Sequence, residues 1–65
     1  MIEVLDLRRD GVEQPQFFML TFRRPNQGAG YRQTIETGTE AYLRGVLRDG
    51  GIAGPSIDNL FANAH

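Results

Sequence analysis

The 65-residue chain contains no cysteine, and its one histidine is the last residue, His65. Disulfides are therefore excluded, and so is a zinc site built from cysteine and histidine ligands. No acidic loop has the alternating aspartate pattern that binds calcium, so we expect no metal ion and no other cofactor. One domain over residues 1–65 is expected, and a domain of this size buries only about 60% of the surface that its unfolded chain exposes. Its stability has to come from one packed core or from association with another copy or another protein.

Lysine is absent as well, because all seven basic residues are arginine, and eight acidic residues give a net charge of −1. This balance argues against a generic nucleic-acid-binding protein, which carries a basic excess. No apolar run approaches the roughly 20 residues that span a bilayer. We expect no signal peptide in the first residues, since Glu3 and Asp6 interrupt the first apolar stretch. We therefore expect a cytoplasmic protein that does not enter a membrane.

Residues that catalyse reactions near neutral pH are also scarce. His65 lies at the chain end, and Ser56 has no second histidine in the sequence to activate it. Acidic residues that are close in sequence, such as Asp6 and Asp10, fit solvated surface charge better than a hydrolase pair held in a cleft. The sequence predicts no catalytic residue and favours a protein without enzymatic activity.

Three segments have the composition of β-strands. The strongest is 16–24, where aromatic and bulky apolar residues lie between Pro15 and Pro25. Segment 31–36 alternates cleanly, whereas 2–9 alternates only partly and also fits the stripe of a helix. Short connections between the three segments predict an antiparallel meander in the order 1-2-3.

A first helix is predicted after the third strand. Thr37 and Glu40 have the spacing of a capping box, with Thr37 as the N-cap. The apolar stripe that follows consists of Leu43, Val46 and Leu47. Gly50 and Gly51 then end the helix through a left-handed cap.

A second, shorter helix is predicted with Ser56 as its N-cap, directly after the Gly54 and Pro55 break. Its inward residues are expected to be Ile57, Leu60 and Phe61. The predicted fold is therefore α+β, a three-stranded antiparallel meander followed by two short helices on one face (βββαα). The alternative is αββα(α), which applies if the N-terminal segment is helical.

The two faces of the central strand predict where a partner binds. We expect the helices to cover one face of the sheet, formed by Phe18, Leu20 and Phe22 with Tyr31 and Ile35 beside them. Phe17 and Met19 then point to the other face and form an apolar patch there, which usually marks a contact. The first hypothesis is a non-enzymatic interaction module or small regulator. It forms a homodimer or binds a larger protein through this face.

The second hypothesis is a small nucleic-acid-binding regulator. Arg23 and Arg32 are expected to meet near the second turn, alongside Thr34, and to form a small cationic spot. Arginine suits contacts with phosphate because its planar guanidinium donates in pairs. This hypothesis is less favoured, because such charges also discourage unwanted pairing at a sheet edge.

Residues 43–52, which read L-R-G-V-L-R-D-G-G-I, resemble the last helix and turn of the HicA-type toxins. These are small RNA-cleaving partners in toxin–antitoxin pairs, and the family places a three-stranded sheet before that helix. The resemblance implies the same fold and a role linked to nucleic acid. The histidine on which the family relies has no counterpart in the matching residues 14–18, so the resemblance implies a non-catalytic relative.

Overall fold

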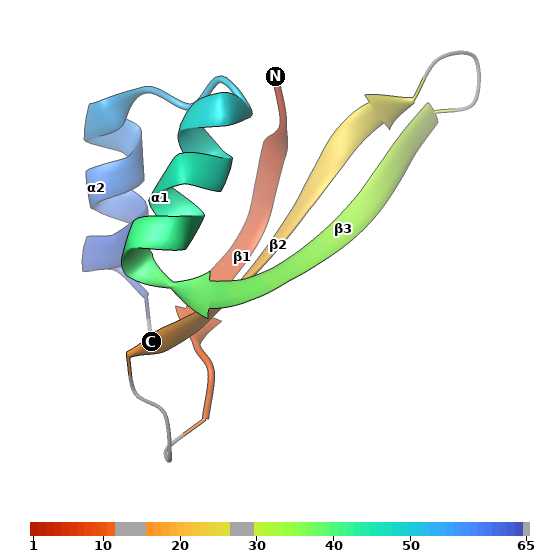
Figure 1. Ribbon diagram of the computed structural model, residues 1–65. Helices are drawn as coiled ribbons and strands as arrows, with labels where there is room; N and C mark the ends of the chain where they lie inside the picture. The colour runs from red at the N-terminus through yellow and green to blue at the C-terminus, as the bar shows by residue number, and fades with distance from the viewer. Residues whose placement is uncertain (12–15, 27–29, 65) are drawn as a thin grey trace.

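The computed structural model describes residues 1–11, 16–26 and 30–64. Five elements follow one another along the chain: β1 (Glu3–Arg9), β2 (Phe17–Asn26), β3 (Gly30–Thr39), α1 (Glu40–Asp49) and α2 (Gly54–Ala62) (Figure 1). The predicted α+β fold with the order βββαα is confirmed. The N-terminal segment is a strand, so the alternative with a helix at that position is wrong.

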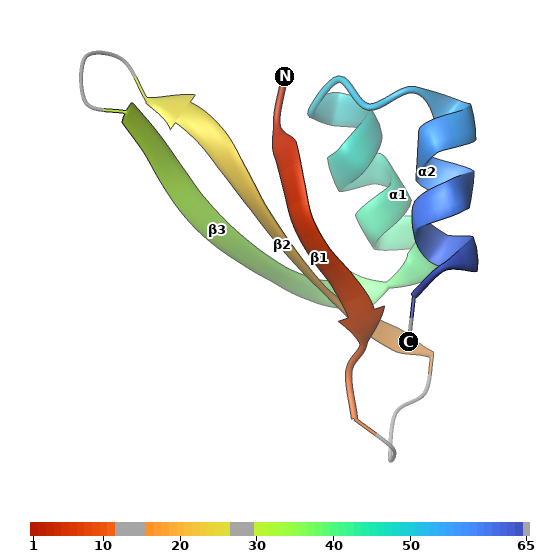
Figure 2. The same cartoon turned by 180° about the vertical axis from the view of Figure 1, so that it is seen from behind.

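The three strands form one antiparallel sheet in the order β1-β2-β3. Both helices lie on the same side of this sheet (Figures 1 and 2). β1 pairs with β2 only as far as Glu3 opposite Arg23, whereas β2 and β3 stay paired up to Asn26 opposite Gly30. The hairpin therefore extends past β1 as a two-stranded ribbon. We call this part, Arg24–Asn26 with Gly30–Arg32, the arm.

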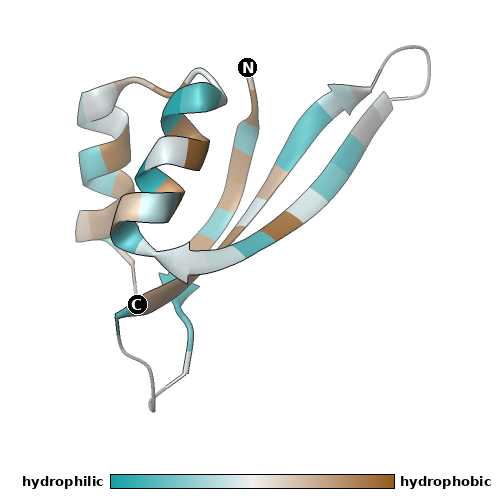
Figure 3. Ribbon diagram, viewed as in Figure 1, coloured by the Kyte–Doolittle hydropathy of each residue, from teal (hydrophilic) through white to brown (hydrophobic). Residues whose placement is uncertain are grey.

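The hydrophobic core lies between the sheet and the two helices. β2 contributes the face that the sequence predicts, and the buried apolar residues are Ile2, Leu7, Phe18, Leu20, Phe22, Leu43, Leu47 and Ile57. Burying a side chain of this size stabilises a protein by about 1.5–3 kcal/mol. Figure 3 shows that the hydrophobic part of β2 lies next to the helices, whereas its far end is hydrophilic.

The register between β2 and β3 corrects one prediction. Ile35 lies opposite Thr21, on the face that the helices leave open, and it is 57% exposed. It is therefore not beside the helix-covered residues, as the sequence predicted, and Glu36 occupies that side opposite Leu20. Tyr31 pairs with Pro25, and its side chain lies outside the described part of the structure. Alternation within one strand defines two faces, but the hairpin decides which of them matches the neighbouring strand.

A β-bulge explains why the N-terminal strand alternates only partly. The register shifts between Val4 and Asp6, so that Leu5 is an extra residue without a partner on β2. Val4 and Leu7 consequently lie opposite Phe22 and Leu20, and both share the helix-covered face. An apolar pattern interrupted in this way does not fit a regular strand, and this is why the segment also fitted the stripe of a helix.

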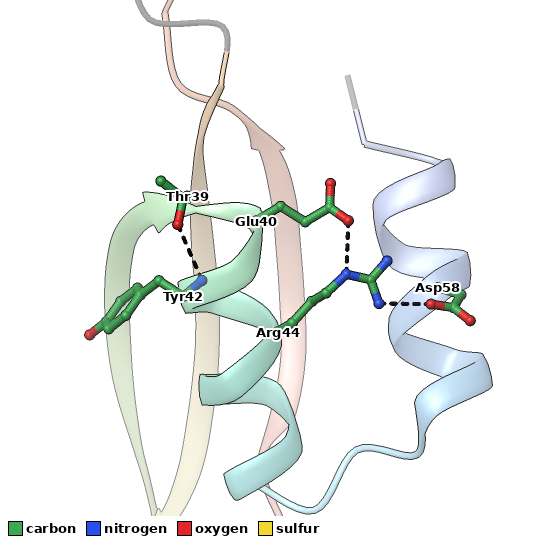
Figure 4. A network of polar contacts seen from close by, with 5 residues as sticks. All are labelled: Thr39, Glu40, Tyr42, Arg44 and Asp58. Carbon is green, nitrogen blue, oxygen red and sulfur yellow. Dashed lines mark hydrogen bonds and ion pairs between the residues drawn. The ribbon is translucent and has the colours of Figure 1, made fainter.

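Helix α1 begins two residues later than the sequence predicted. Thr39, not Thr37, is the N-cap, and its Oγ1 accepts a hydrogen bond from the N–H of Tyr42 at 3.2 Å (Figure 4). Thr37 remains in β3, opposite Met19. Two threonines compete for the cap position, and sheet pairing holds the first of them in an extended conformation.

The C-terminus of α1 has the predicted glycine stop. Gly51 adopts a φ of +94°, and its N–H donates to the carbonyl of Arg48 at 3.0 Å. The N–H of Ile52 donates to the carbonyl of Leu47 at 3.0 Å, which completes a Schellman motif. The neighbouring carbonyl of Gly50 accepts from the N–H of Ile2 at 2.9 Å. This end of the helix therefore also fastens the start of the chain.

Helix α2 begins at Gly54 with Ala53 as N-cap and no side-chain cap bond, so the prediction of Ser56 as N-cap is wrong. Pro55 occupies the first turn, where its missing N–H costs nothing.

Arg44 joins the two helices. Its guanidinium donates to Glu40 Oε2 at 2.8 Å and to Asp58 Oδ1 at 2.7 Å (Figure 4). The hydrogen bonds to Asp58 and then Glu40 raise the pKa of Arg44 above its ordinary value. The same guanidinium lies 5.0 Å from the ring centroid of Phe61, which packs edge-on against Phe18 at 5.1 Å. Arg44 thus ties α2 to α1 and, through Phe61, to the sheet.

Two glycine substitutions should have opposite effects on stability. We expect Gly51→Ala to lower the free energy of unfolding by about 1–2 kcal/mol, because its positive φ disfavours a side chain. Gly45→Ala is the matched control, since it lies inside α1 and a Cβ there meets nothing within 4 Å. It should raise the same quantity by about 0.5–1 kcal/mol. Urea denaturation followed by circular dichroism measures both, and equal effects would contradict the assigned helix end.

Candidate functional site

Within the described residues, one face of the sheet carries no helix, and we call it the open face (Figures 1 and 2). Outside the arm, the strand register places eleven of the described residues on it: Glu3, Asp6, Arg8, Phe17, Met19, Thr21, Arg23, Gln33, Ile35, Thr37 and Thr39. Three of them are large and apolar. Phe17 and Met19 are half-buried, and Ile35 is exposed.

The predicted patch residues Phe17 and Met19 thus occupy the predicted face. Met19 lies between Arg8 on β1 and Thr37 on β3, and Phe17 lies opposite Thr39. Neighbouring side chains of the same chain therefore cover part of both. Ile35 is a member of the patch that sequence reasoning missed, because only the register across the hairpin shows which face it occupies.

Ion pairs balance the charge on the β1 side of the open face. Arg8 Nε lies 2.9 Å from Asp6 Oδ2, and Arg23 Nη2 lies 2.6 Å from Glu3 Oε1. Pairs as exposed as these contribute at most about 1 kcal/mol each to stability. On the β3 side the face carries threonine, glutamine and Ile35. The open face is therefore close to neutral, with an apolar centre.

The predicted cationic spot is composed differently in the structure. Arg23 lies opposite Gln33, whereas Arg32 lies opposite Arg24, so Arg23 and Arg32 occupy opposite faces of the hairpin. Arg24 takes the place that the sequence analysis gave to Arg23. Thr34 shares this face with Arg32, and it is half-buried.

The side chain of Arg24 has a defined support. Its guanidinium lies over the ring of Phe22, 5.3 Å from the centroid. Phe22 is completely buried, so the ring offers the arginine a fixed surface. Arg24, Arg32 and Thr34 together form a cluster of hydrogen-bond donors at the base of the arm.

A groove of about 690 Å³ separates β1 from α2. Its apolar walls consist of Met1, Val4, Leu5, Leu7, Ile52 and Leu60. α2 lies beyond β1 instead of over the centre of the sheet, and Figure 2 shows this arrangement from behind. The bulge adds Leu5 to the wall, where it is 42% exposed. Sequence reasoning missed this groove, and the irregular alternation of the first strand was its only signal.

The described residues present two apolar surfaces and one cationic surface. Within the residues that the structure describes, no three histidine, cysteine, aspartate or glutamate side chains come together to hold a metal ion. No helix in the described ranges is long and apolar enough to cross a membrane. The open face and the groove offer apolar contacts, and the arm offers cationic donors.

One hydrogen bond near these surfaces affects a titratable group. The Tyr42 hydroxyl donates to Glu36 Oε1 at 3.2 Å. This bond and the charge of Glu36 raise the pKa of Tyr42 above the ordinary tyrosine value. The ring of Tyr42 lies against Gly38, where a Cβ would come within 2.7 Å of its Cδ2 atom. The absence of a side chain at Gly38 therefore allows Tyr42 of α1 to pack closely against β3.

The titration of Tyr42 should depend on Glu36. In a Tyr31→Phe background, where Tyr42 is the one tyrosine left, we expect a tyrosinate titration at a pH above the ordinary range. The added substitution Glu36→Ala removes both the acceptor and the charge, and it should lower the pKa of Tyr42 toward its usual value. Stability from this bond is present below the unfolded pKa and is lost as the pH rises through the folded pKa. Ultraviolet absorbance measures the titration, and an identical curve in both variants would rule out the bond.

Known proteins give no further guide to these surfaces. Comparison of the chain with family models, with curated proteins and with solved structures found no match in any of the three. The resemblance of residues 43–52 to the HicA-type toxins thus has no support from these comparisons.

Proposed function

We propose that the protein is a non-enzymatic interaction module that self-associates through its open face. The observation that carries the proposal is the position of both helices on one side of the sheet. The other side keeps Ile35 57% exposed, and it also carries the half-buried Phe17 and Met19. Burial of such apolar surface is the main favourable term in protein association. The cytoplasmic location expected from the sequence belongs to the same proposal.

A second copy suits this face for electrostatic reasons. The Asp6–Arg8 and Glu3–Arg23 pairs cancel their charges within one copy. Two such faces meet without net repulsion, whereas a face with an excess of one charge selects a partner of the opposite charge. Two sheets that stack about 10 Å apart form a sandwich. In that arrangement each copy supplies the layer that the other lacks.

The size of the face sets the strength of the contact. Three strands about 4.8 Å apart and about seven residues long give a face of roughly 330 Å². Stable protein interfaces bury about 800 Å² on each partner. Because the face is smaller than this, we expect a weak, reversible dimer.

Sedimentation equilibrium over protein concentrations from about 10 μM to 1 mM, where weak dimers form, tests the proposal. We expect the average mass of the wild-type protein to rise toward that of a dimer. Ile35→Glu and Met19→Glu should keep it at the monomer value, because each places a charge in the apolar centre of the interface. Circular dichroism verifies that both variants remain folded, and Ile35→Glu is the milder of the two because Ile35 is already exposed.

Leu5→Glu is the matched control, since it introduces the same charge at an exposed apolar residue of the groove. It should dimerise like the wild type. A wild-type protein that stays monomeric over the whole range contradicts self-association. Loss of the dimer in Leu5→Glu alone would move the interface to the groove and overturn the role of the open face.

A further inference from the structure

The charges of the chain are unevenly distributed along it. Residues 23–35 contain three arginines and no acidic residue, a local net charge of +3. The rest of the chain carries four arginines and eight acidic residues, a net charge of −4. The overall charge of −1 therefore hides a basic hairpin attached to an acidic body.

The strand register concentrates this charge at one spot. Arg24 and Arg32 lie directly opposite each other on neighbouring strands. Like charges in this position destabilise a sheet. The third arginine, Arg23, faces the other way and is paired with Glu3. In the described part of the chain neither Arg24 nor Arg32 forms an ion pair with an acidic side chain. An anion bound between them would remove the repulsion.

The surroundings of the two arginines favour a phosphate group. Both belong to the arm, which projects past β1 and away from the helices (Figure 1). Arg24 is supported by the Phe22 ring, and Thr34 adds a hydroxyl on the same face. Guanidinium groups donate pairs of hydrogen bonds that match the oxygen atoms of phosphate.

We propose that the arm binds the phosphate backbone of duplex DNA through Arg24 and Arg32, with Thr34 beside them. A two-stranded ribbon fits the major groove of B-form DNA, which is about 12 Å wide. The major groove of A-form RNA is too narrow to admit side chains in this way. The acidic body limits the contact to the arm. This site differs from the open face, so it does not depend on self-association.

The strength of binding should depend on salt in a defined way. Each phosphate contact contributes about 0.9 to the slope of log affinity against log salt concentration on B-form DNA. Two contacts predict a slope of about −1.8, which means that affinity falls about tenfold between roughly 50 and 200 mM salt.

Fluorescence anisotropy with a labelled DNA duplex of about 20 base pairs measures this slope on the full chain. We expect Arg24→Gln and Arg32→Gln each to reduce the slope by about 0.9. Arg24→Lys keeps the positive charge and should retain the wild-type slope. Arg48→Gln is the matched control, because Arg48 is an exposed arginine in the last turn of α1, outside the arm.

Three results would overturn the proposal. The first is no anisotropy change at about 50 mM salt, where two phosphate contacts are weakened least by screening. The second is an unchanged slope in both glutamine variants. The third is tighter binding to single-stranded DNA, to duplex RNA of the same sequence or to phosphatidylserine vesicles. Ile35→Glu should bind DNA with the wild-type slope, so failure of this proposal and failure of self-association are distinguishable.

Discussion

The structure depends on one contact layer, in which Phe18, Leu20 and Phe22 of β2 pack against Leu43 and Leu47 of α1. Leu20, Phe22, Leu43 and Leu47 have no exposed surface at all, and β2 is the central strand, so this layer holds together the sheet and the helix that covers it. A chain of 65 residues supplies only enough apolar residues for one such layer. α2 adds Ile57 to the core from the same side, so the described residues leave the opposite face of the sheet without cover. The open face is thus a direct consequence of where the single core lies.

The second helix shows how the chain extends this core with few residues. α2 lies beyond β1, where little of the sheet is beneath it (Figure 2). Ile57 is buried in the common core, and the ring of Phe61 packs edge-on against Phe18. Arg44 then holds α2 from the side through Asp58 and the face of Phe61. A helix held at these points leaves a groove along β1, because the part of the chain that the structure describes has no further strand to fill that space.

Sequence patterns predicted those features that depend on neighbours along the chain. The two faces of β2 followed from alternation, and the end of α1 followed from Gly50 and Gly51. Features that depend on pairing between strands were predicted less well. Ile35 and Arg32 were placed on the wrong faces relative to β2, because alternation in one strand does not determine its register with the next strand. The start of α1 was placed at Thr37 instead of Thr39, because local spacing does not show how far β3 remains paired. The bulge at Leu5 concealed the face of β1 for the same reason.

The same strand register also determines how the charges of the protein are arranged. Composition alone gives a slightly acidic chain, which argues against binding to nucleic acid. In the folded chain, Glu3 offsets Arg23 on the open face, while Arg24 and Arg32 meet on the other side of the same hairpin. One face of the hairpin is therefore neutral and apolar at its centre, and the other is cationic at its end. The electrostatic field that a partner encounters depends on the charges within one Debye length of it, roughly 10 Å. It does not depend on the net charge of the whole chain. Two different contacts can thus be separated on a single pair of strands, because neighbouring residues of a strand point to opposite sides.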